Sequence, residues 1–413
     1  MASPPKATAK ITSKLLSGLG ASTAHPLASI PLPDPVDAGC EIRDYEVLGS
    51  YNWLDSQAPT IIIPGQPRIW QEPSLPLQLS LDRGYTLLDQ NAWRSRDSPL
   101  EPLFRAIAVT QQSIGNTSFS LSEQRIDVVT DRNNLRKLSV MIRSMRSNEN
   151  LTPSKSKEFR VDAQLAPNGR TLLLTRYSDQ PRQMINQGDT GYGTSFERAT
   201  TNDYTPILVQ NHEKSERTNF CPTSYHRIVK YSLADLNLLV RYEVDAVQPV
   251  QSLDNLSVSG QESVEQKRPE IQPHSTLRHI VSGSLISQDR IIELKTGTSN
   301  SKLKWNKIRP QMYFSQTPIL KVGIHQKGKF SKVEVHEIDE SYNGRAVESI
   351  QDLTDNLRFL VSALEQMRHA CQQHGRSGKP LAFFWSGAGP LQLYEVGHPK
   401  RSHNLPKDIL ESL

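Results

Sequence analysis

Two short runs of the sequence combine charged side chains with apolar neighbours in a pattern that could form a catalytic or metal-binding site. The first is RYEVD at residues 241–245, and the second is IELK at residues 292–295. Side chains two residues apart in a strand point to the same face of a sheet, so each run places its charged groups together. A carboxylate in a core strand is costly unless a partner neutralises its charge, so both runs need an explanation.

Carboxylates on two such strands can together hold a hard divalent cation. Mg²⁺ prefers oxygen ligands and usually keeps part of its water shell. Glu243, Asp245 and Glu293 would supply the carboxylates, and Lys295 would add a positive charge beside them. We therefore interpret the runs as two adjacent central strands that carry the site of a metal-dependent phosphodiesterase. The alternative is that each run is an ordinary half-exposed edge strand, which also alternates charged and aliphatic residues.

Composition narrows the class of protein. The 413 residues suit one large domain, and a net charge of +5 is compatible with nucleic-acid binding without requiring it. The 3 cysteines form no CxxC pair and the 11 histidines no HExxH motif, so neither a zinc site nor a disulfide framework is evident. No apolar run approaches the roughly 20 residues of a membrane helix, and we expect no membrane partner.

The domain boundaries follow from shifts in composition. Residues 1–40 are rich in Ser, Ala, Pro and Lys and have no acidic residue before Asp34, which predicts a disordered basic tail. A transit peptide is the alternative, although this segment contains no arginine. Residues 41–413 are expected to form a single domain. Within it, residues 251–279 are polar and without periodicity, which predicts a flexible insertion.

The elements that position the charged runs can be read from periodicity. Residues 126–130 are strand-like and leucines at helical spacing follow, so Arg132 should lie at a strand-to-helix junction. Residues 159–177 and 319–338 each predict a β-hairpin. Residues 350–367 carry apolar side chains at spacings of three and four, typical of an amphipathic helix packed on a core. We therefore predict an α/β (mixed α+β) fold with central mixed β-sheets flanked by helices.

The sequence resembles the DXO family of decapping exoribonucleases, because the two charged runs and several further motifs occur in the order found in that family. These eukaryotic enzymes remove faulty or nucleotide-cofactor caps and degrade RNA from its 5′ end. The family's arginine motif looks like VVTDRNNLRKL, which contains Arg132, and its Gly-x-x-Phe-Glu motif looks like residues 193–197. Its Glu-x-Asp and Glu-Leu-Lys-Thr motifs look like residues 243–245 and 293–296. A glutamine followed by a proline and a glycine looks like Gln311, Pro318 and Gly323.

The resemblance implies a decapping-nuclease-like domain with a PD-(D/E)XK-like core and a role for each of these residues. One or two Mg²⁺ or Mn²⁺ ions would be held by Glu197, Glu243, Asp245, Glu293 and the backbone carbonyl of Leu294. Lys295 and Gln311 would position the attacking water and the scissile phosphate, and Arg132 would bind RNA phosphates. The implied catalytic set is Glu243, Asp245, Glu293, Lys295 and Gln311, and the implied substrate-binding set is Arg132, Glu197, Lys295 and Gln311.

The leading hypothesis is a metal-dependent RNA 5′-end processing nuclease. It would remove aberrant or NAD-type caps or 5′ triphosphates and degrade RNA 5′ to 3′, in mRNA quality control in the nucleus, the cytoplasm or both. Its partners would be RNA 5′ ends and a nuclear 5′-to-3′ exoribonuclease. The alternative is a regulatory binding module that stabilises such an exoribonuclease with little catalysis of its own. The intact acidic set favours the enzyme, because a binding module has no need of costly buried carboxylates. A DNA nuclease stays open as well, since RNA and DNA differ locally by the 2′-hydroxyl.

Overall fold

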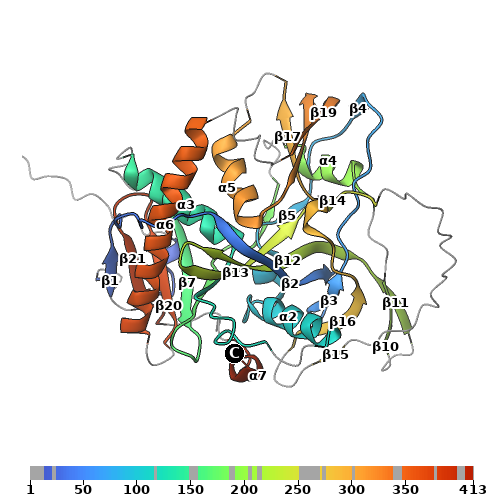
Figure 1. Cartoon of the computed structure of the whole chain (residues 1–413). Helices are drawn as coiled ribbons and strands as arrows, with labels where there is room; N and C mark the ends of the chain where they lie inside the picture. Colours follow the sequence, from blue (N-terminus) through green and yellow to red (C-terminus); the bar gives the residue numbers. More distant parts are fainter. Residues whose placement is uncertain are drawn as a thin grey trace, which may run out of the picture.

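A twelve-stranded β-sheet and a five-stranded β-sheet form the framework of the protein (Figure 1). The structure is a computed structural model, and it describes residues 14–20, 25–115, 119–147, 157–185, 191–202, 207–211, 216–250, 270–271, 276–299, 303–337, 347–375, 379–397 and 405–412. Two strand pairs in these ranges stand apart from both sheets: β5 (Tyr85–Leu87) with β9 (Arg182–Met184), and β10 (Ile207–Asn211) with β11 (Glu216–Phe220).

The large sheet is mixed. In spatial order it contains β1 (Ala28–Ile30), β21 (Leu391–Glu395), β20 (Leu381–Trp385), β7 (Phe159–Leu165), β8 (Leu172–Arg176), β6 (Val128–Asp131), β13 (Leu236–Val244), β12 (Pro222–Leu233), β2 (Ile42–Leu54), β3 (Thr60–Gly65), β16 (Arg278–Gly283) and β15 (Glu270–Ile271). β6 runs parallel to β8 and β13, and β3 runs parallel to β16, whereas the other pairs are antiparallel. The hairpin predicted over residues 159–177 is confirmed, because β7 and β8 pair antiparallel.

The small sheet continues directly from the large one. It contains β14 (Ala246–Val247), β17 (Ile291–Thr298), β18 (Ile319–Gln326), β19 (Lys329–Glu337) and β4 (Leu77–Gln78). A single residue, Asp245, separates β13 from β14, so the chain passes from one sheet to the other there. Both charged runs are internal strands as predicted, but the prediction that they are adjacent strands is wrong. β17 pairs with β14, because the chain leaves the large sheet directly after β13.

Helices cover both faces of the large sheet (Figure 1). The described helices are α1 (Gln90–Arg94), α2 (Glu101–Ser113), α3 (Arg132–Arg146), α4 (Gly193–Ala199), α5 (Trp305–Ser315), α6 (Val347–His374) and α7 (Lys407–Ser412), with 3₁₀ turns η1 (Lys14–Leu16) and η2 (Gln288–Arg290). α3 and α6 pack on one face, and α2 and α7 on the other. α4 and α5 pack on strands of the small sheet. None of the described helices combines the length and the apolar composition that a membrane span requires.

Alternating side chains explain why β13 lies in the centre of the large sheet. Val240 joins the core under α3 and α6, whereas its neighbour Leu239 joins the core under α2. The same alternation places Val229 and Ile228 of β12 in opposite cores. Because successive side chains of a strand point to opposite faces, an apolar run of this kind is buried on both sides.

The junction between β6 and α3 places Arg132 as the sequence predicted. β6 ends at Asp131 and α3 begins at Arg132. The apolar positions that follow, at helical spacing, are buried against the sheet, which fixes the direction of the helix. These positions are Leu135, Leu138, Met141 and Ile142.

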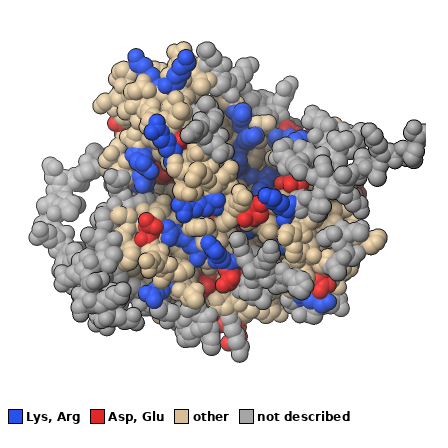
Figure 2. Space-filling view, turned by 180° about the vertical axis from the view of Figure 1, so that it is seen from behind, with Lys and Arg blue, Asp and Glu red and all other residues tan. Residues whose placement is uncertain are grey.

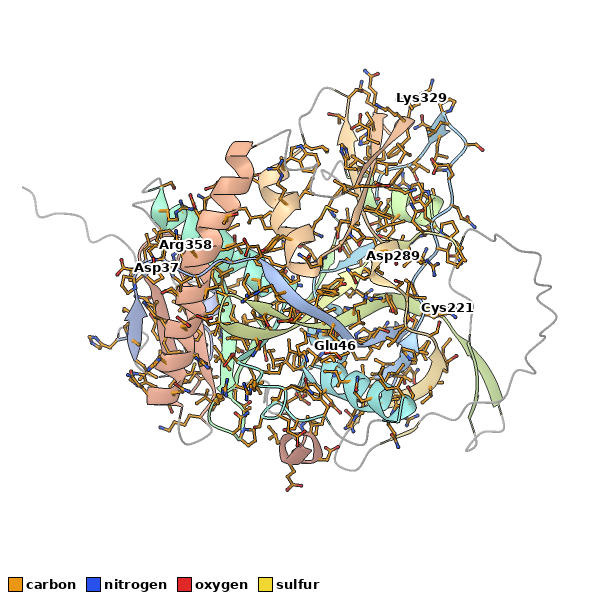
Figure 3. All side chains as sticks on the ribbon, viewed as in Figure 1. Asp37, Glu46, Cys221, Asp289, Lys329 and Arg358 are labelled. Carbon is orange, nitrogen blue, oxygen red and sulfur yellow. The ribbon has the colours of Figure 1, made fainter. Side chains whose placement is uncertain are left out.

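Parts of the predicted N-terminal tail pack on the domain. Of residues 1–40, the structure describes 14–20 and 25–40. β1 pairs with β21 at the edge of the large sheet, and Ile30 is buried. Arg358 of α6 donates to the Val36 carbonyl at 2.6 Å and to the Asp37 carboxylate at 3.3 Å (Figure 3). A composition averaged over forty residues hides the few apolar side chains that make these contacts.

Most of the predicted insertion over 251–279 lies outside the described residues. Within it the structure describes 270–271 and 276–279. Residues 270–271 form β15, which pairs antiparallel with the start of β16 at 278–279. This described part of the insertion therefore extends the edge of the large sheet.

Candidate active site

The acidic residues predicted from the two charged runs meet where the two sheets join. Glu243 lies near the end of β13, Asp245 follows that strand, and Glu293 lies on β17. The Leu294 amide donates a hydrogen bond to Asp245 Oδ2 at 2.8 Å. This bond holds the end of β13 against β17, so the carboxylates of both runs share one site.

A glycine lets α4 bring Glu197 to the same place. Phe196, the preceding residue, is fully buried and stacks on Phe330 with ring centres 4.8 Å apart. A Cβ atom at Gly323 would come within 2.5 Å of the Phe196 ring, so a side chain there would push α4 away. Gly323 is the glycine of the predicted glutamine-proline-glycine motif, and its role is this close approach.

Glu293 is the centre of a buried hydrogen-bond network. The side chain is only 2% exposed. Arg132 Nη1 donates to Oε2 at 3.2 Å, and both Lys295 Nζ and Gln311 Nε2 donate to Oε1. Burial alone would raise the pKa of Glu293, but Lys295 and Arg132 outweigh it and lower the pKa to about 2. Glu293 is therefore an anion across the physiological pH range.

The other three carboxyl groups lack enough positive charge around them. Burial, with repulsion from Glu293 and Glu197, raises the pKa of Asp245 to about 8. Desolvation and repulsion from Asp245 raise the pKa of Glu243 to about 7, but its side chain is exposed to solvent at a pocket, which weakens both effects. Burial and repulsion from Glu243 likewise raise the pKa of Glu197 to about 7. Such a cluster favours either protonation or a bound cation.

The Lys295 ammonium group binds two of the oxygens predicted for a metal ion. It donates to Glu293 Oε1 and, at 3.0 Å, to the Leu294 carbonyl. Burial alone would lower the pKa of Lys295, but Glu293 and Asp245 outweigh it and raise the pKa. Lys295 is therefore charged, and the two oxygens together attract a cation.

The donor set fits a hard divalent cation in its chemistry. It consists of carboxylates and one backbone carbonyl, and oxygen ligands suit Mg²⁺ and Mn²⁺. Among the residues that the structure describes, no three Asp, Glu, His or Cys side chains lie in an arrangement that could hold a metal ion. Glu293 is engaged by Lys295 and Gln311, and Asp245 by the Leu294 amide. A cation would have to compete with these donors.

A polar pocket of about 150 Å³ opens beside Glu243. Its wall includes the buried pair of Arg241 and Asp131, joined by hydrogen bonds of 2.7 and 3.0 Å. Arg176, paired with Asp89 at 3.5 Å, lies on the same wall. Figure 2 shows Lys and Arg side chains gathered around a hollow on one face of the molecule, with Asp and Glu side chains at its margin.

Arg136 is the pocket residue best placed to bind an anion. It lies one helical turn after Arg132 and lines the pocket. In the part of the chain that the structure describes, the Arg136 side chain forms no ion pair or hydrogen bond. Burial and the positive charge of Arg132 lower the pKa of Arg136. A negatively charged ligand in the pocket would offset both the burial of the guanidinium group and its repulsion by Arg132.

The structure brings all the predicted site residues into one region. Arg132, which the resemblance assigned to RNA phosphates, lines the pocket and donates to Glu293 and to Ser315 Oγ, each at 3.2 Å. Sequence reasoning missed Arg136, Arg176 and Asp89. The spacing of Arg136, four residues after Arg132, is a usable signal because such residues share one helix face. Asp89 and Arg176 are far apart in the sequence and carry no such signal.

The fold is that of Rai1, a nuclease of the DXO family, so the predicted resemblance and the predicted mixed fold are confirmed at the level of the fold. Scheffersomyces stipitis Rai1, solved with (3′-NADP)⁺ and calcium, has a TM-score of 0.57 and 13% identity, with 94% of this chain and 100% of that chain covered. Candida albicans Rai1, solved with pU5 and Mn²⁺, has a TM-score of 0.55 and 13% identity, with coverage of 93% and 98%. S. pombe Rai1, solved with 3′-FADP, has a TM-score of 0.51 and 12% identity, with coverage of 89% and 99%.

The sequence itself defines the family. A family model described as Domain of unknown function (DUF8563) matches residues 37–387, and the chain belongs to this family. A search of curated proteins found no match to the sequence.

Proposed function

We propose that the protein is a metal-dependent nuclease that processes RNA 5′ ends. It removes aberrant or NAD-type caps or 5′ triphosphates and degrades RNA 5′ to 3′. The observation that carries this proposal is the convergence of Glu197, Glu243, Asp245 and Glu293 beside an arginine-lined pocket. Proteins of similar fold were solved with pU5 and Mn²⁺ and with 3′-FADP, which supports RNA and nucleotide-type substrates.

The proposed metal ligands are Glu197, Glu243, Asp245, Glu293 and the Leu294 carbonyl. Bound Mg²⁺ or Mn²⁺ would supply positive charge to the scissile phosphate and lower the pKa of water. The carboxylates would hold that charge in place, and the bound cation would favour their ionised forms. Without a cation, the raised pKa values of Glu197, Glu243 and Asp245 make the fully ionised cluster unfavourable.

Lys295 and Gln311 supply hydrogen-bond donors at the same point. Both donate to Glu293 Oε1, so an ammonium group and an amide converge there. A scissile phosphate beside Glu293 would meet these two donors, which stabilise developing negative charge. Lys295 is suited to this because its pKa is raised and it stays protonated.

Arg136 and the pocket bind the 5′ end itself. A terminal phosphate or cap pyrophosphate carries the charge that the Arg136 guanidinium, unpaired among the described residues, needs. A guanidinium binds phosphate oxygens in pairs. Arg132 and Arg176 add positive charge on the same side of the pocket. A pocket beside the carboxylates would place the first phosphodiester bond at the site, which favours attack from the 5′ end.

A direct assay tests the proposal. The purified full chain is incubated with Mg²⁺ or Mn²⁺ and with RNAs that carry a 5′ monophosphate, a 5′ triphosphate or an NAD cap. We expect metal-dependent release of 5′ products from at least one of them and none with EDTA. Tight binding of RNA or of a separate exoribonuclease without turnover would instead favour the regulatory binding module. The partner exoribonuclease and the nuclear or cytoplasmic location are part of the same proposal and rest on the resemblance alone.

A further inference from the structure

An exposed stack of arginines and aromatic rings lies beside the candidate active site. The Arg182 guanidinium lies 3.9 Å from the Tyr85 ring centre and 5.4 Å from that of Trp93. The Arg96 guanidinium lies 4.9 Å from the Trp93 ring centre. We call Tyr85, Trp93, Arg96 and Arg182 the arginine–aromatic ladder. Tyr85 is 54% exposed, more than any other Phe, Trp or Tyr among the described residues.

The ladder is continuous with the candidate site through residues 82–89. At one end of this segment, Asp82 accepts hydrogen bonds from the Thr194 and Ser195 amides at 3.2 and 2.8 Å, in the first turn of the helix that carries Glu197. At the other end, Leu88 and Asp89 line the pocket. Tyr85 lies between these two ends, so the short segment that carries the exposed ring is anchored to the site at both ends.

Local pairing holds the ladder in place. Tyr85 and Met184 are partners in the β5–β9 ribbon, and Leu87 is the partner of Arg182. The Leu88 and Asp89 amides both donate to the Pro181 carbonyl, at 2.8 and 3.1 Å. The inner face of the Tyr85 ring is therefore fixed against Arg182, while the side chain stays open to solvent. A ring held in this way loses little conformational freedom when a ligand stacks on it.

We propose that the arginine–aromatic ladder binds the single-stranded RNA that follows the 5′ end held in the pocket. This inference rests on the proposed function. An unpaired base stacks on an aromatic ring or on a guanidinium plane, and the arginines neutralise the phosphates between successive bases. The ladder offers both groups in alternation.

Charge complementarity favours RNA over a protein partner as the occupant. Arg83, Arg96 and Arg182 are exposed beside Tyr85, and the acidic Asp82 is engaged by the amides of α4. An apolar protein surface would leave these guanidinium groups desolvated and without partners, which is costly. A polyanion with flat bases satisfies the guanidinium groups and the ring together.

The test compares RNA length and ring chemistry. Fluorescence anisotropy in Ca²⁺ or EDTA measures binding of a labelled 5′-phosphorylated dinucleotide and of a labelled 5′-phosphorylated oligouridylate of about 12 nucleotides. The variants are Tyr85→Phe, which keeps the stacking ring, and Tyr85→Leu, which keeps apolar area without a ring. Arg182→Ala removes the central guanidinium. Arg125→Ala is the charge-matched control, because Arg125 is exposed near the opposite end of the strand that leads to Arg132.

We expect Tyr85→Leu and Arg182→Ala to weaken binding of the longer RNA by about tenfold and to leave the dinucleotide unaffected. Tyr85→Phe and Arg125→Ala should match the wild type. The ladder proposal is wrong if Tyr85→Leu binds the longer RNA like the wild type, or if both RNAs lose affinity equally. It is also wrong if another protein co-purifies with the wild type but not with Tyr85→Leu, while Tyr85→Leu still binds RNA. Binding is measured without turnover, so a wild-type protein that binds RNA but never cleaves it contradicts only the proposed function.

Discussion

The Leu294 amide donates a hydrogen bond of 2.8 Å to Asp245 Oδ2, and this contact joins the two sheets at the candidate active site. Asp245 is the single residue between β13 and β14, and Leu294 follows Glu293 on β17. The bond therefore sets the position of Glu293 relative to Glu243. Any change that shifts β17 along β14 would separate the carboxylates of the two runs.

Removing a carboxylate charge should abolish turnover. Asp245→Asn and Glu293→Gln keep the side-chain shape but remove ligand charge, so we expect each to lower RNA hydrolysis by at least about 10²-fold. Single-turnover assays with Mn²⁺ measure the effect. Full activity of the double variant would show that the metal-site assignment is wrong.

The same two variants should change stability in opposite directions in EDTA at about pH 8. Asp245→Asn removes a charge that repels its neighbours, and should raise the melting temperature. Glu293→Gln leaves Arg132 and Lys295 without a buried counter-ion, and should lower the free energy of unfolding by up to about 3–5 kcal/mol. Thermal unfolding of both variants beside the wild type measures the contrast. Shifts of the same sign would show that the carboxylates do not repel one another.

The metal-free protein should lose stability as the pH rises. The pKa values of Glu197 and Glu243 are raised from 4.5 to about 7, and that of Asp245 from 3.8 to about 8. A raised folded-state pKa gives stability that is complete below the unfolded pKa and is lost as the pH rises through the folded value. The melting temperature in EDTA should therefore fall between about pH 5 and pH 8, and Mn²⁺ should restore it at the upper end. A melting temperature that is flat over this range in EDTA would contradict the raised pKa values.

Arg136→Ala should weaken binding of the RNA 5′ end. Arg136 lines the pocket without a partner in the described part of the chain, so its loss removes a phosphate contact but no internal ion pair. We expect KM for 5′-monophosphorylated RNA to rise by about tenfold, with a smaller change in kcat. Arg143→Ala on the same helix is the matched control, because Arg143 pairs with Asp352 at 3.3 Å instead. If both substitutions raise KM equally, the weaker binding comes from a disturbed α3 helix and not from a lost phosphate contact in the pocket.

Replacing residues 253–269 with a short Gly/Ser linker tests the predicted insertion. This segment has few apolar residues to offset an ordering entropy of roughly 1–2 kcal/mol per residue. We therefore expect a nearly unchanged melting temperature and altered affinity for long RNA or a changed preference among 5′ ends. A large drop in melting temperature would mean that the segment contributes to the core.

The sequence was sufficient to predict the strands and most of the acidic set, because local patterns determine them. The apolar residues on both sides of the charges in residues 241–245 and 292–295 predicted internal strands, and the change of period after residue 130 predicted the position of Arg132. What local patterns cannot show is which strands become neighbours. The break at Asp245, which sends β13 and β17 into different sheets, depends on contacts far apart in the sequence.

The pairing of Arg132 with Glu293 was missed for the same reason. These residues are 161 positions apart, and nothing near either one indicates the other. The pocket residues Asp89 and Arg176 likewise come from separate elements. A motif predicts which residues reach the site, whereas the partner of each side chain depends on how the sheets and helices pack.

The central claim is that the chain hydrolyses RNA from its 5′ end with a divalent metal ion. One measurement tests it most directly: the purified protein is incubated with Mn²⁺ and two RNAs of the same sequence, one linear with a 5′ monophosphate and one circular. We predict that the linear RNA shortens from its 5′ end, that the circle survives, and that EDTA or Asp245→Asn stops the reaction. Rapid cutting of the circle, or no hydrolysis of either RNA with Mn²⁺, would contradict the account.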